Sequence, residues 1–201
     1  MYIPHQFKFK DRNEMVAFMK RYSFATIVTV KGNIPLATQL PFWVDDSAGG
    51  LRLISHFALA NEQAKYIEGN TSLVIFSEPH AYISPVHYDK KESVPTWDYM
   101  AVHAYGEPKI IAGENAVAGV LEQMIRFYEP GYLQQWNSLP EKYKKGMMKA
   151  IVAFEIEVVD LQGQKKLSQN KTAAERQRIS EHLEKSENTV EMAIAQHIRE
   201  L

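Results

Sequence analysis

The chain has 201 residues, of which 45% are hydrophobic and 23% charged, and its formal net charge is -1. This balance is typical of a globular protein with one domain, or one domain and an appendage, and it excludes a global positive field that would attract nucleic acid or an anionic membrane. The absence of cysteine excludes disulfides, thiol catalysis and thiolate metal sites.

The first half of the chain predicts short strands separated by tight turns. Strands are expected at 24–30, 34–44, 51–57 and 71–77, where β-branched and other apolar residues lie between turn signals. Pro35 and Pro41 confine the second strand to a sheet edge or a bulge, and Gly32 can take the positive φ of a tight turn. Helices are expected at 11–21, capped by Asp11, and at 58–69, closed by Gly69.

The second half predicts a different order of elements. A polar loop at 85–95 precedes a strand at 96–111, which we expect to bend at Gly106 and Pro108. The later elements are expected to be helices at 114–129 and about 141–149, a long strand at 150–163, and two charged helices at about 171–184 and 187–200. Hairpins followed by helices and a final strand favour an antiparallel barrel decorated by helices.

This order divides the chain into two predicted domains. We expect a barrel domain at 1–170, with helices inserted at about 114–149, and a helical appendage at 171–201. The N-terminus lacks a signal-peptide pattern, and no segment approaches the length of about 20 apolar residues that spans a bilayer. We therefore expect a cytoplasmic protein that does not enter a membrane.

Motifs for common enzyme chemistry are missing from the sequence. It has no G-x-S-x-G, Rossmann or P-loop pattern, and no catalytic residue is predicted. The histidines that could act as metal ligands lie outside the usual metal-binding patterns, so no metal site is predicted: His56, His80, His87 and His103. The groups that could hold the phosphate of a bound nucleotide are Ser55, His56, Asn61 and Lys166.

The last two predicted helices are joined by a short turn, as in a helix-turn-helix motif. The second of them carries three glutamates, Glu187, Glu191 and Glu200, against Arg199 alone. Affinity for DNA depends on neutralising phosphates, so this charge argues against direct DNA binding here. The alternative is a solvated helical tail that covers the barrel or a partner subunit.

A row of aromatic and imidazole rings lies along the strand expected at 96–111. Trp97, Tyr99, His103 and Tyr105 alternate along the sequence, so they fall on one face of a strand. Rings with polar edges suit a flat heteroaromatic ligand, and they suit a subunit interface equally well. The spacing alone does not choose between a ligand site and a subunit interface. A ligand pocket between two subunits would satisfy both interpretations.

Several blocks of sequence, taken in order, resemble the PaiB family. They are MYIP at the start, FATIVTV at 24–30, P-x-A-T-x-L-P at 35–41, SHFALAN at 55–61, PHAYISP at 79–85, VPTWDYMAVHAYG at 94–106 and KLSQN at 166–170. The resemblance covers nearly the whole chain. The family is described as FMN-binding negative transcriptional regulators, associated with repression of protease synthesis and sporulation.

The resemblance implies an FMN-binding split barrel, which is a six-stranded antiparallel Greek-key barrel, and a homodimer with flavin at the dimer interface. It implies FMN as the cofactor, with Lys166 supplying positive charge to the phosphate. The resemblance, together with the phosphate candidates above, places these residues at the cofactor: Thr38, Gln39, Leu40, Pro41, Ser55, His56, Asn61, Trp97, Tyr99, Lys166, Ser168 and Gln169.

Four residues depart from the family pattern in this proposed pocket. Gln39 stands where His is usual, Ala64 and His87 stand where Trp is common, and Asp98 replaces Asn. If Asp98 faced the flavin, its negative charge would oppose the phosphate or a reduced ring.

The resemblance implies a negative transcriptional regulator that contacts DNA through a local patch or acts on it indirectly. An FMN-dependent oxidoreductase acting on a small molecule is the alternative, with His103 and Tyr99 as acid–base candidates. A haem-handling relative, with His87 and His103 as axial ligands, is the third reading.

Overall fold

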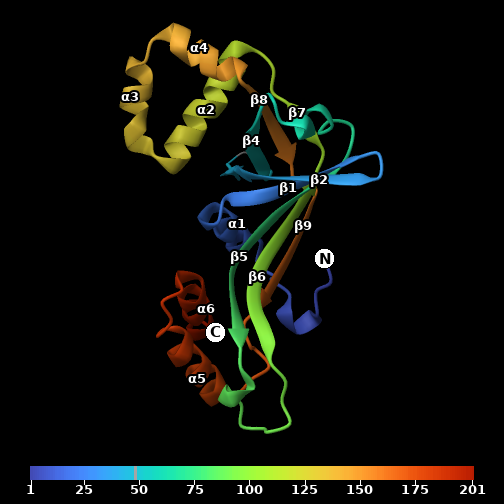
Figure 1. Ribbon diagram of the computed structural model, residues 1–201, viewed down its shortest axis with the longest axis vertical. Coiled ribbons are helices and arrows are strands. Elements are labelled where there is room, and N and C mark those ends of the chain that lie inside the picture. The colour runs from blue at the N-terminus through green and yellow to red at the C-terminus, as the bar shows by residue number, and fades with distance from the viewer. Residues whose placement is uncertain (48) are drawn as a thin grey trace. The chain divides into compact units, whose positions relative to one another are not determined.

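A computed structural model describes residues 1–47 and 49–201, which form two compact units (Figure 1). The terminal unit contains Met1–Met15, Ser77–Val102 and Gln162–Leu201. The central unit contains Val16–Phe76 and His103–Leu161. The predicted domain boundary at residue 170 stays a prediction. Every helix of the described residues is too short or too polar to cross a membrane.

The central unit is built from antiparallel strands in two sheets. The first sheet has the order β2-β1-β5 in this unit, with β2 at its edge. The second sheet has the order β3-β4-β8-β7. β1 and β2 pair along their whole length around a turn in which Gly32 has φ +61°. The strand bounds are β1 Phe24–Lys31, β2 Ile34–Pro41, β3 Trp43–Asp45, β4 Arg52–Ala58, β5 Ser72–Ile83, β7 Pro108–Ile110 and β8 Ile151–Glu157.

The core of the central unit is aromatic, and Phe42 lies at its centre. The Phe42 ring packs against Phe76 of β5, with ring centroids 6.0 Å apart, and against Phe154 of β8, 6.2 Å apart. Phe154 also stacks on Phe57 of β4, at 5.0 Å. All four rings are fully buried, so they join side chains of both sheets in one core.

Phe42 also explains why the predicted strand at 34–44 is two strands. The chain leaves the first sheet after Pro41 and enters the second at Trp43, while Phe42 turns its side chain into the core. Strands that switch between packed sheets form corners of this kind. The prediction that Pro35 and Pro41 lie on an edge strand is confirmed, because β2 ends its sheet.

Two other predicted strands change sheet in the same way. The strand at 96–111 becomes β6 (Thr96–Gly106) and β7, with the predicted bend at Gly106. A Cβ atom on Gly106 would come within 2.2 Å of the Glu157 carbonyl oxygen, so only glycine fits this corner. The single strand predicted at 150–163 is wrong, because it divides into β8 and β9 (Asp160–Lys166), which belong to different sheets.

Helices cover one side of the second sheet. Val120 and Met124 on α2 (Glu114–Tyr128) pack on Ile54 of β4 and Ala153 of β8. Figure 1 shows α2, α3 and α4, from yellow to orange, as one helical insert between β7 and β8. The bounds of the elements after α2 are η4 Pro130–Tyr132, α3 Leu133–Ser138 and α4 Glu141–Lys149. The predictions at 114–129 and 141–149 are confirmed, whereas α3 was not predicted.

The helix predicted at 58–69 is wrong. Ala58 completes β4, and only a 3-10 turn, η2 (Glu62–Lys65), follows it. Asn61 caps this turn, because its side chain accepts a hydrogen bond from the Gln63 backbone N–H. Gly69 has φ +76°, the conformation expected of a glycine that closes a helix, but the predicted helix does not precede it.

In the terminal unit, the order of the strands is β5-β6-β9, and β5 extends to Ile83, beyond its predicted end. The predicted C-terminal helices are α5 (Ala173–Leu183), which starts with a capping box of Thr172 and Glu175, and α6 (Thr189–Arg199). The predicted helix at 11–21 is α1 (Arg12–Arg21), and Asp11 caps it. Two 3-10 turns complete the fold, η1 His5–Phe7 and η3 Pro85–His87.

Candidate functional site

The predicted cofactor residues of the central unit centre on a polar network between β2 and η2. The Asn61 amide donates to Thr38 Oγ1 at 3.1 Å, and the Thr38 hydroxyl donates to Gln63 Oε1 at 2.7 Å. The amide of buried Gln63 donates to the Ile27 and Leu36 carbonyl oxygens, each at 3.2 Å. The network holds the hydroxyl of Thr38 and the amide of Asn61 in fixed positions. Gln63 was not predicted, because its local sequence N-E-Q-A-K is mostly polar and does not distinguish it from its neighbours.

The remaining β2 residues offer different groups. Gln39 is exposed, whereas the Leu40 side chain is buried in the core, so only the Leu40 backbone can meet a ligand. The Pro41 carbonyl accepts a hydrogen bond from the Ser55 hydroxyl at 2.7 Å. Ser55 is fully buried and already bonded, so its hydroxyl serves the fold.

His56 follows Ser55 on β4 and lies on the opposite face of the strand, because side chains alternate along a strand. Its ring lines a pocket with residues of the helical insert, among them Met124 and Trp136. Burial lowers the pKa of His56, which favours the neutral ring. The structure therefore does not bring Ser55 and His56 together.

The predicted residues of the terminal unit include an exposed aromatic surface. Trp97 is 54% exposed, and its ring packs on His80 at 6.0 Å and on Tyr82 at 5.9 Å. We call these three rings the Trp97 surface. Lys166 donates to the Trp97 carbonyl oxygen at 2.6 Å and to the Thr96 hydroxyl, which orients its ammonium group.

The alternation predicted for the aromatic row is confirmed. Trp97, Tyr99, His103 and Tyr105 are each partly or largely exposed. The intervening Asp98, Met100, Val102 and Ala104 are buried, so the rings share the more exposed face of β6. His80 and Tyr82 were not predicted as partners of this row, because they lie on the neighbouring strand β5 and only strand pairing brings them close.

Asp98 does not face a ligand on the Trp97 surface. Its side chain is fully buried on the other face of β6, where Asp98 Oδ2 accepts a hydrogen bond from the Ser168 hydroxyl at 2.6 Å. Asp98 Oδ1 has no hydrogen-bond partner among the residues that the structure describes. Burial raises the pKa of Asp98 to about 6, against the opposing effects of Ser168 and Lys166.

Ser168 and Gln169 belong to the segment that holds Asp98. Ser168 is buried in a left-handed conformation, with φ +57°, and its hydroxyl is bonded to Asp98. Gln169 accepts a hydrogen bond from the Leu167 N–H at 2.8 Å and donates to the Lys165 carbonyl oxygen. Both side chains therefore support the connection between β9 and α5.

The two other departures from the family pattern lie in different units. Ala64 is buried in the central unit beside Gln63. His87 of η3 lies in the terminal unit, and its ring centroid is 4.8 Å from that of His182 on α5. Burial first, and then the charges of His182 and Arg178, lower the pKa of His87. Within residues 1–47 and 49–201, no cluster of three His, Asp or Glu side chains could hold a metal ion.

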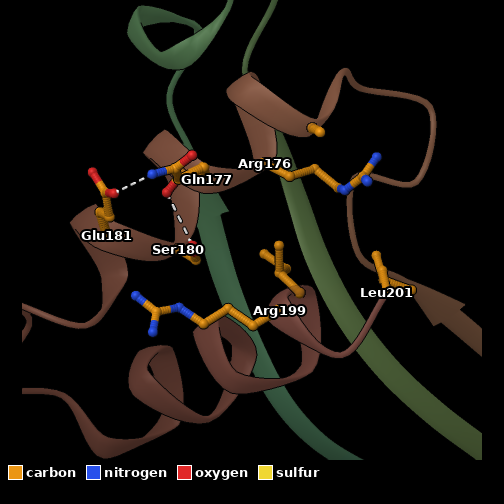
Figure 2. A pocket seen from close by; sticks show the side chains of 8 residues that line it. Arg176, Gln177, Ser180, Glu181, Arg199 and Leu201 are labelled. Carbon is orange, nitrogen blue, oxygen red and sulfur yellow. Dashed lines mark hydrogen bonds between the residues drawn. The ribbon is translucent and has the colours of Figure 1, made fainter.

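The C-terminal helices carry little free positive charge. Arg178 pairs with Asp89 at 2.5 Å, and Arg199 pairs with Glu184. Figure 2 shows a groove between α5 and α6 in which the guanidinium groups of Arg176 and Arg199 point in different directions. The two guanidinium groups do not converge on one anion.

Comparison with known proteins gives one matching family model and several relatives of similar length. Residues 1–160 match the model of a family described as "Putative FMN-binding domain". The chain is 37% identical over 191 residues to "Protease synthase and sporulation protein PAI 2" of Bacillus subtilis (strain 168), with 94% of this chain and 91% of that protein covered. It is 28% identical to an uncharacterized protein of Emericella nidulans, with coverage of 84% and 80%.

Two solved structures share the fold at low sequence identity. The flavocytochrome Anf3 from Azotobacter vinelandii matches with a TM-score of 0.66 at 15% identity, over 81% of this chain and 70% of that one. The FAD and heme binding protein from Mycobacterium smegmatis matches with a TM-score of 0.62 at 15% identity, over 78% and 71%. The predicted fold, a flavin-binding split barrel decorated by helices, is confirmed.

Replacing Asp98 by Asn tests the cost of its buried charge. The pKa of Asp98 lies above its ordinary value of 3.8, at about 6, so folding favours the protonated form. The carboxylate therefore destabilises the fold progressively from about pH 4 to pH 6, and fully above pH 6. We expect Asp98→Asn to raise the free energy of unfolding on the order of 2 kcal/mol at pH 8, and to change it little at pH 3.5.

Urea unfolding at both pH values measures this difference. Glu92→Gln, which changes an exposed carboxyl group of the same unit, is the matched control and should alter stability equally little at either pH. An Asp98→Asn variant that shows the same stability difference at pH 3.5 and pH 8 would contradict the assignment.

Proposed function

Because the chain belongs to the PaiB-like family of FMN-binding domains, we propose that it is an FMN-binding regulatory protein that represses protease synthesis and sporulation. One observation carries this proposal: the alignment with the Bacillus subtilis protein named for protease synthesis and sporulation covers 94% of this chain and 91% of that protein. Both chains therefore share the FMN-binding region and the segment that follows it.

The β2 edge is the part of the central unit that best fits a flavin nucleotide. An edge strand presents backbone N–H and C=O groups without a strand partner, and β2 ends its sheet. The Thr38 hydroxyl, the exposed Gln39 amide and the Asn61 amide lie on β2 and the turn beside it. When bound, FMN supplies a flat redox-active ring and a phosphate dianion.

The residues of the β2 edge would bind and orient the nucleotide. Asn61 is held by Thr38 and by the Gln63 backbone N–H, so its amide is oriented before a ligand arrives. The contacts implied for Trp97, Tyr99 and Lys166 stay predictions, as does the oxidoreductase alternative.

Removing the Asn61 amide tests the cofactor site. We expect Asn61→Ala to weaken FMN binding about tenfold, the effect of losing a hydrogen bond to a charged or strongly polar group. The measurement is titration of FMN followed by the quenching of flavin fluorescence. Gln134→Ala, an exposed amide of the central unit on α3, is the control and should bind FMN as the parent does.

Lys166→Ala in the same titration tests the predicted cation. Unchanged FMN affinity would remove Lys166 from the phosphate site, and unchanged affinity in Asn61→Ala would remove the β2 edge.

The charges of the C-terminal helices favour regulation without DNA contact through them. Residues 171–201 carry five Lys or Arg against six Glu. Two of the arginines, Arg178 and Arg199, are committed to ion pairs. Binding to DNA gains most of its affinity from uncompensated positive charge, so we propose that α5 and α6 contact protein.

Complementation in Bacillus subtilis tests the regulatory role. In a strain that lacks the protease synthase and sporulation protein, we expect expression of this chain to lower secreted protease activity to the level of the strain that contains it. The Asn61→Ala variant shows whether FMN affinity matters for that effect. Protease activity that does not respond to the parent chain, at matched protein levels, would contradict the proposal.

The Trp97 surface is the part of the terminal unit that best fits a second copy of the chain. It exposes two large aromatic side chains, Trp97 at 54% and Tyr82 at 48%, next to His80. Aromatic residues are enriched at protein interfaces, where Trp often contributes most of the binding energy. We therefore propose a homodimer that covers this surface.

A charge placed on the Trp97 surface tests the dimer. Trp97→Glu should weaken self-association at least about 30-fold, because it removes the ring and buries a carboxylate in the interface. Sedimentation velocity measures the change, and Tyr2→Glu, at another exposed aromatic residue of the terminal unit, is the control. A parent chain that stays monomeric at all concentrations would refute the dimer.

A further inference from the structure

The pocket beside His56 is lined mainly by apolar side chains, which do not suit the phosphate of FMN. Its volume is about 300 Å³, and it lies between β4 and the helical insert. The side chains that line it are His56 of β4, Leu121, Met124, Ile125 and Tyr128 of α2, Glu129, Tyr132 of η4 and Trp136 of α3. Six of the eight are aliphatic or aromatic, so the pocket favours an apolar ligand.

The pairing of β4 with β8 sets the floor beside this pocket. His56 of β4 pairs with Ala153 of β8. Val120 and Met124 pack on Ala153 and Ile54 at one side of the pocket, where they hold α2 to the sheet. These contacts hold the helical insert against β4 and β8 beside the pocket.

The His56 ring that lines the pocket carries one nitrogen without a partner. His56 Nδ1 is buried, and no described residue forms a hydrogen bond with it. A buried polar atom without a partner is costly, and Nδ1 is covered by protein, so a molecule in the pocket that supplies one hydrogen-bonding group gains from contact with it once the imidazole ring turns. In the neutral ring, one nitrogen donates and the other accepts, and either role serves a hydroxyl or an N–H group.

Other side chains define the wall of the pocket. The Tyr128 hydroxyl is held by hydrogen bonds of 2.9 Å to Ser23 Oγ and to the Phe42 carbonyl oxygen. Trp136 is buried, and the Lys144 ammonium lies 5.9 Å from its ring centroid. Because both rings are fixed, the wall is formed before a ligand binds, which lowers the entropy lost on binding.

The charges around the pocket select against phosphate. The described residues that line it include no Lys or Arg, and the exposed Glu129 is its only acidic group. A phosphate dianion would meet apolar side chains and one carboxylate, which is unfavourable. We therefore propose that this pocket binds a small uncharged aromatic molecule with one hydrogen-bonding group, and that His56 holds that group.

The volume agrees with a ligand of this size. About 300 Å³ is the lower end of the range for small-molecule pockets, which suits one or two fused rings. The flat side chains of Tyr128, Tyr132 and Trp136 offer faces and edges for stacking. The site is separate from the β2 edge, so the inference does not depend on FMN binding.

Indole is the probe that tests the proposal, and the methyl resonance of Met124, in protein with ¹³C-labelled methionine, reports its binding. We expect indole to shift the Met124 resonance. His56→Phe keeps a ring and removes the nitrogen, so it should weaken indole binding about fivefold to tenfold while benzene binds equally well or better. His5→Phe, at an exposed histidine of the terminal unit outside the Trp97 surface, is the matched control and should bind indole as the parent does.

Leu121→Trp fills the pocket and should abolish the effects of both indole and benzene on Met124. FMN titration of the same variant separates this site from the cofactor site. Filling the pocket should leave FMN affinity unchanged, whether FMN binds at the β2 edge or at another place outside this pocket. No shift of Met124 at saturating indole would overturn the proposal. So would FMN that competes with indole, or an FMN affinity that falls in His56→Phe.

Discussion

The burial of Phe42 is the constraint on which the rest of the structure depends. Its ring contacts Phe76 in one sheet and Phe154 in the other, so a single side chain joins both layers of the core. The Phe42 backbone N–H donates to the Ser23 carbonyl oxygen at 2.8 Å, which fixes the corner where the chain leaves β2. This corner separates β2, in the first sheet, from β3, in the second.

The same corner determines what each side chain near it can do. Side chains alternate along β2 up to the corner, so Leu40 enters the core and Gln39 stays exposed. The Phe42 carbonyl oxygen accepts a hydrogen bond from the Tyr128 hydroxyl, and this bond attaches the end of α2 to the barrel. The β2 edge and the His56 pocket therefore depend on one buried residue, although they present opposite chemistry to a ligand.

The polar groups of the two units divide into those that support the fold and those that remain for a ligand. Ser55, Ser168 and Gln169 form hydrogen bonds within the protein, and buried polar groups generally need such partners. Gln39 and Asn61 lie at the surface or half-buried. A family motif therefore mixes residues that fold the chain with residues that bind, and only their burial and partners separate the two kinds.

The sequence by itself determined the local elements and the family. Asp11 as a cap, Gly32 and Gly69 at positive φ, and the alternating face of β6 follow from short-range chemistry, which the sequence contains directly. The tertiary structure alone decided where strands change sheet, which face of β4 carries His56, and that Asp98 is buried against Ser168. Those features arise because residues far apart in the chain compete for the same interior, and no local pattern records the outcome.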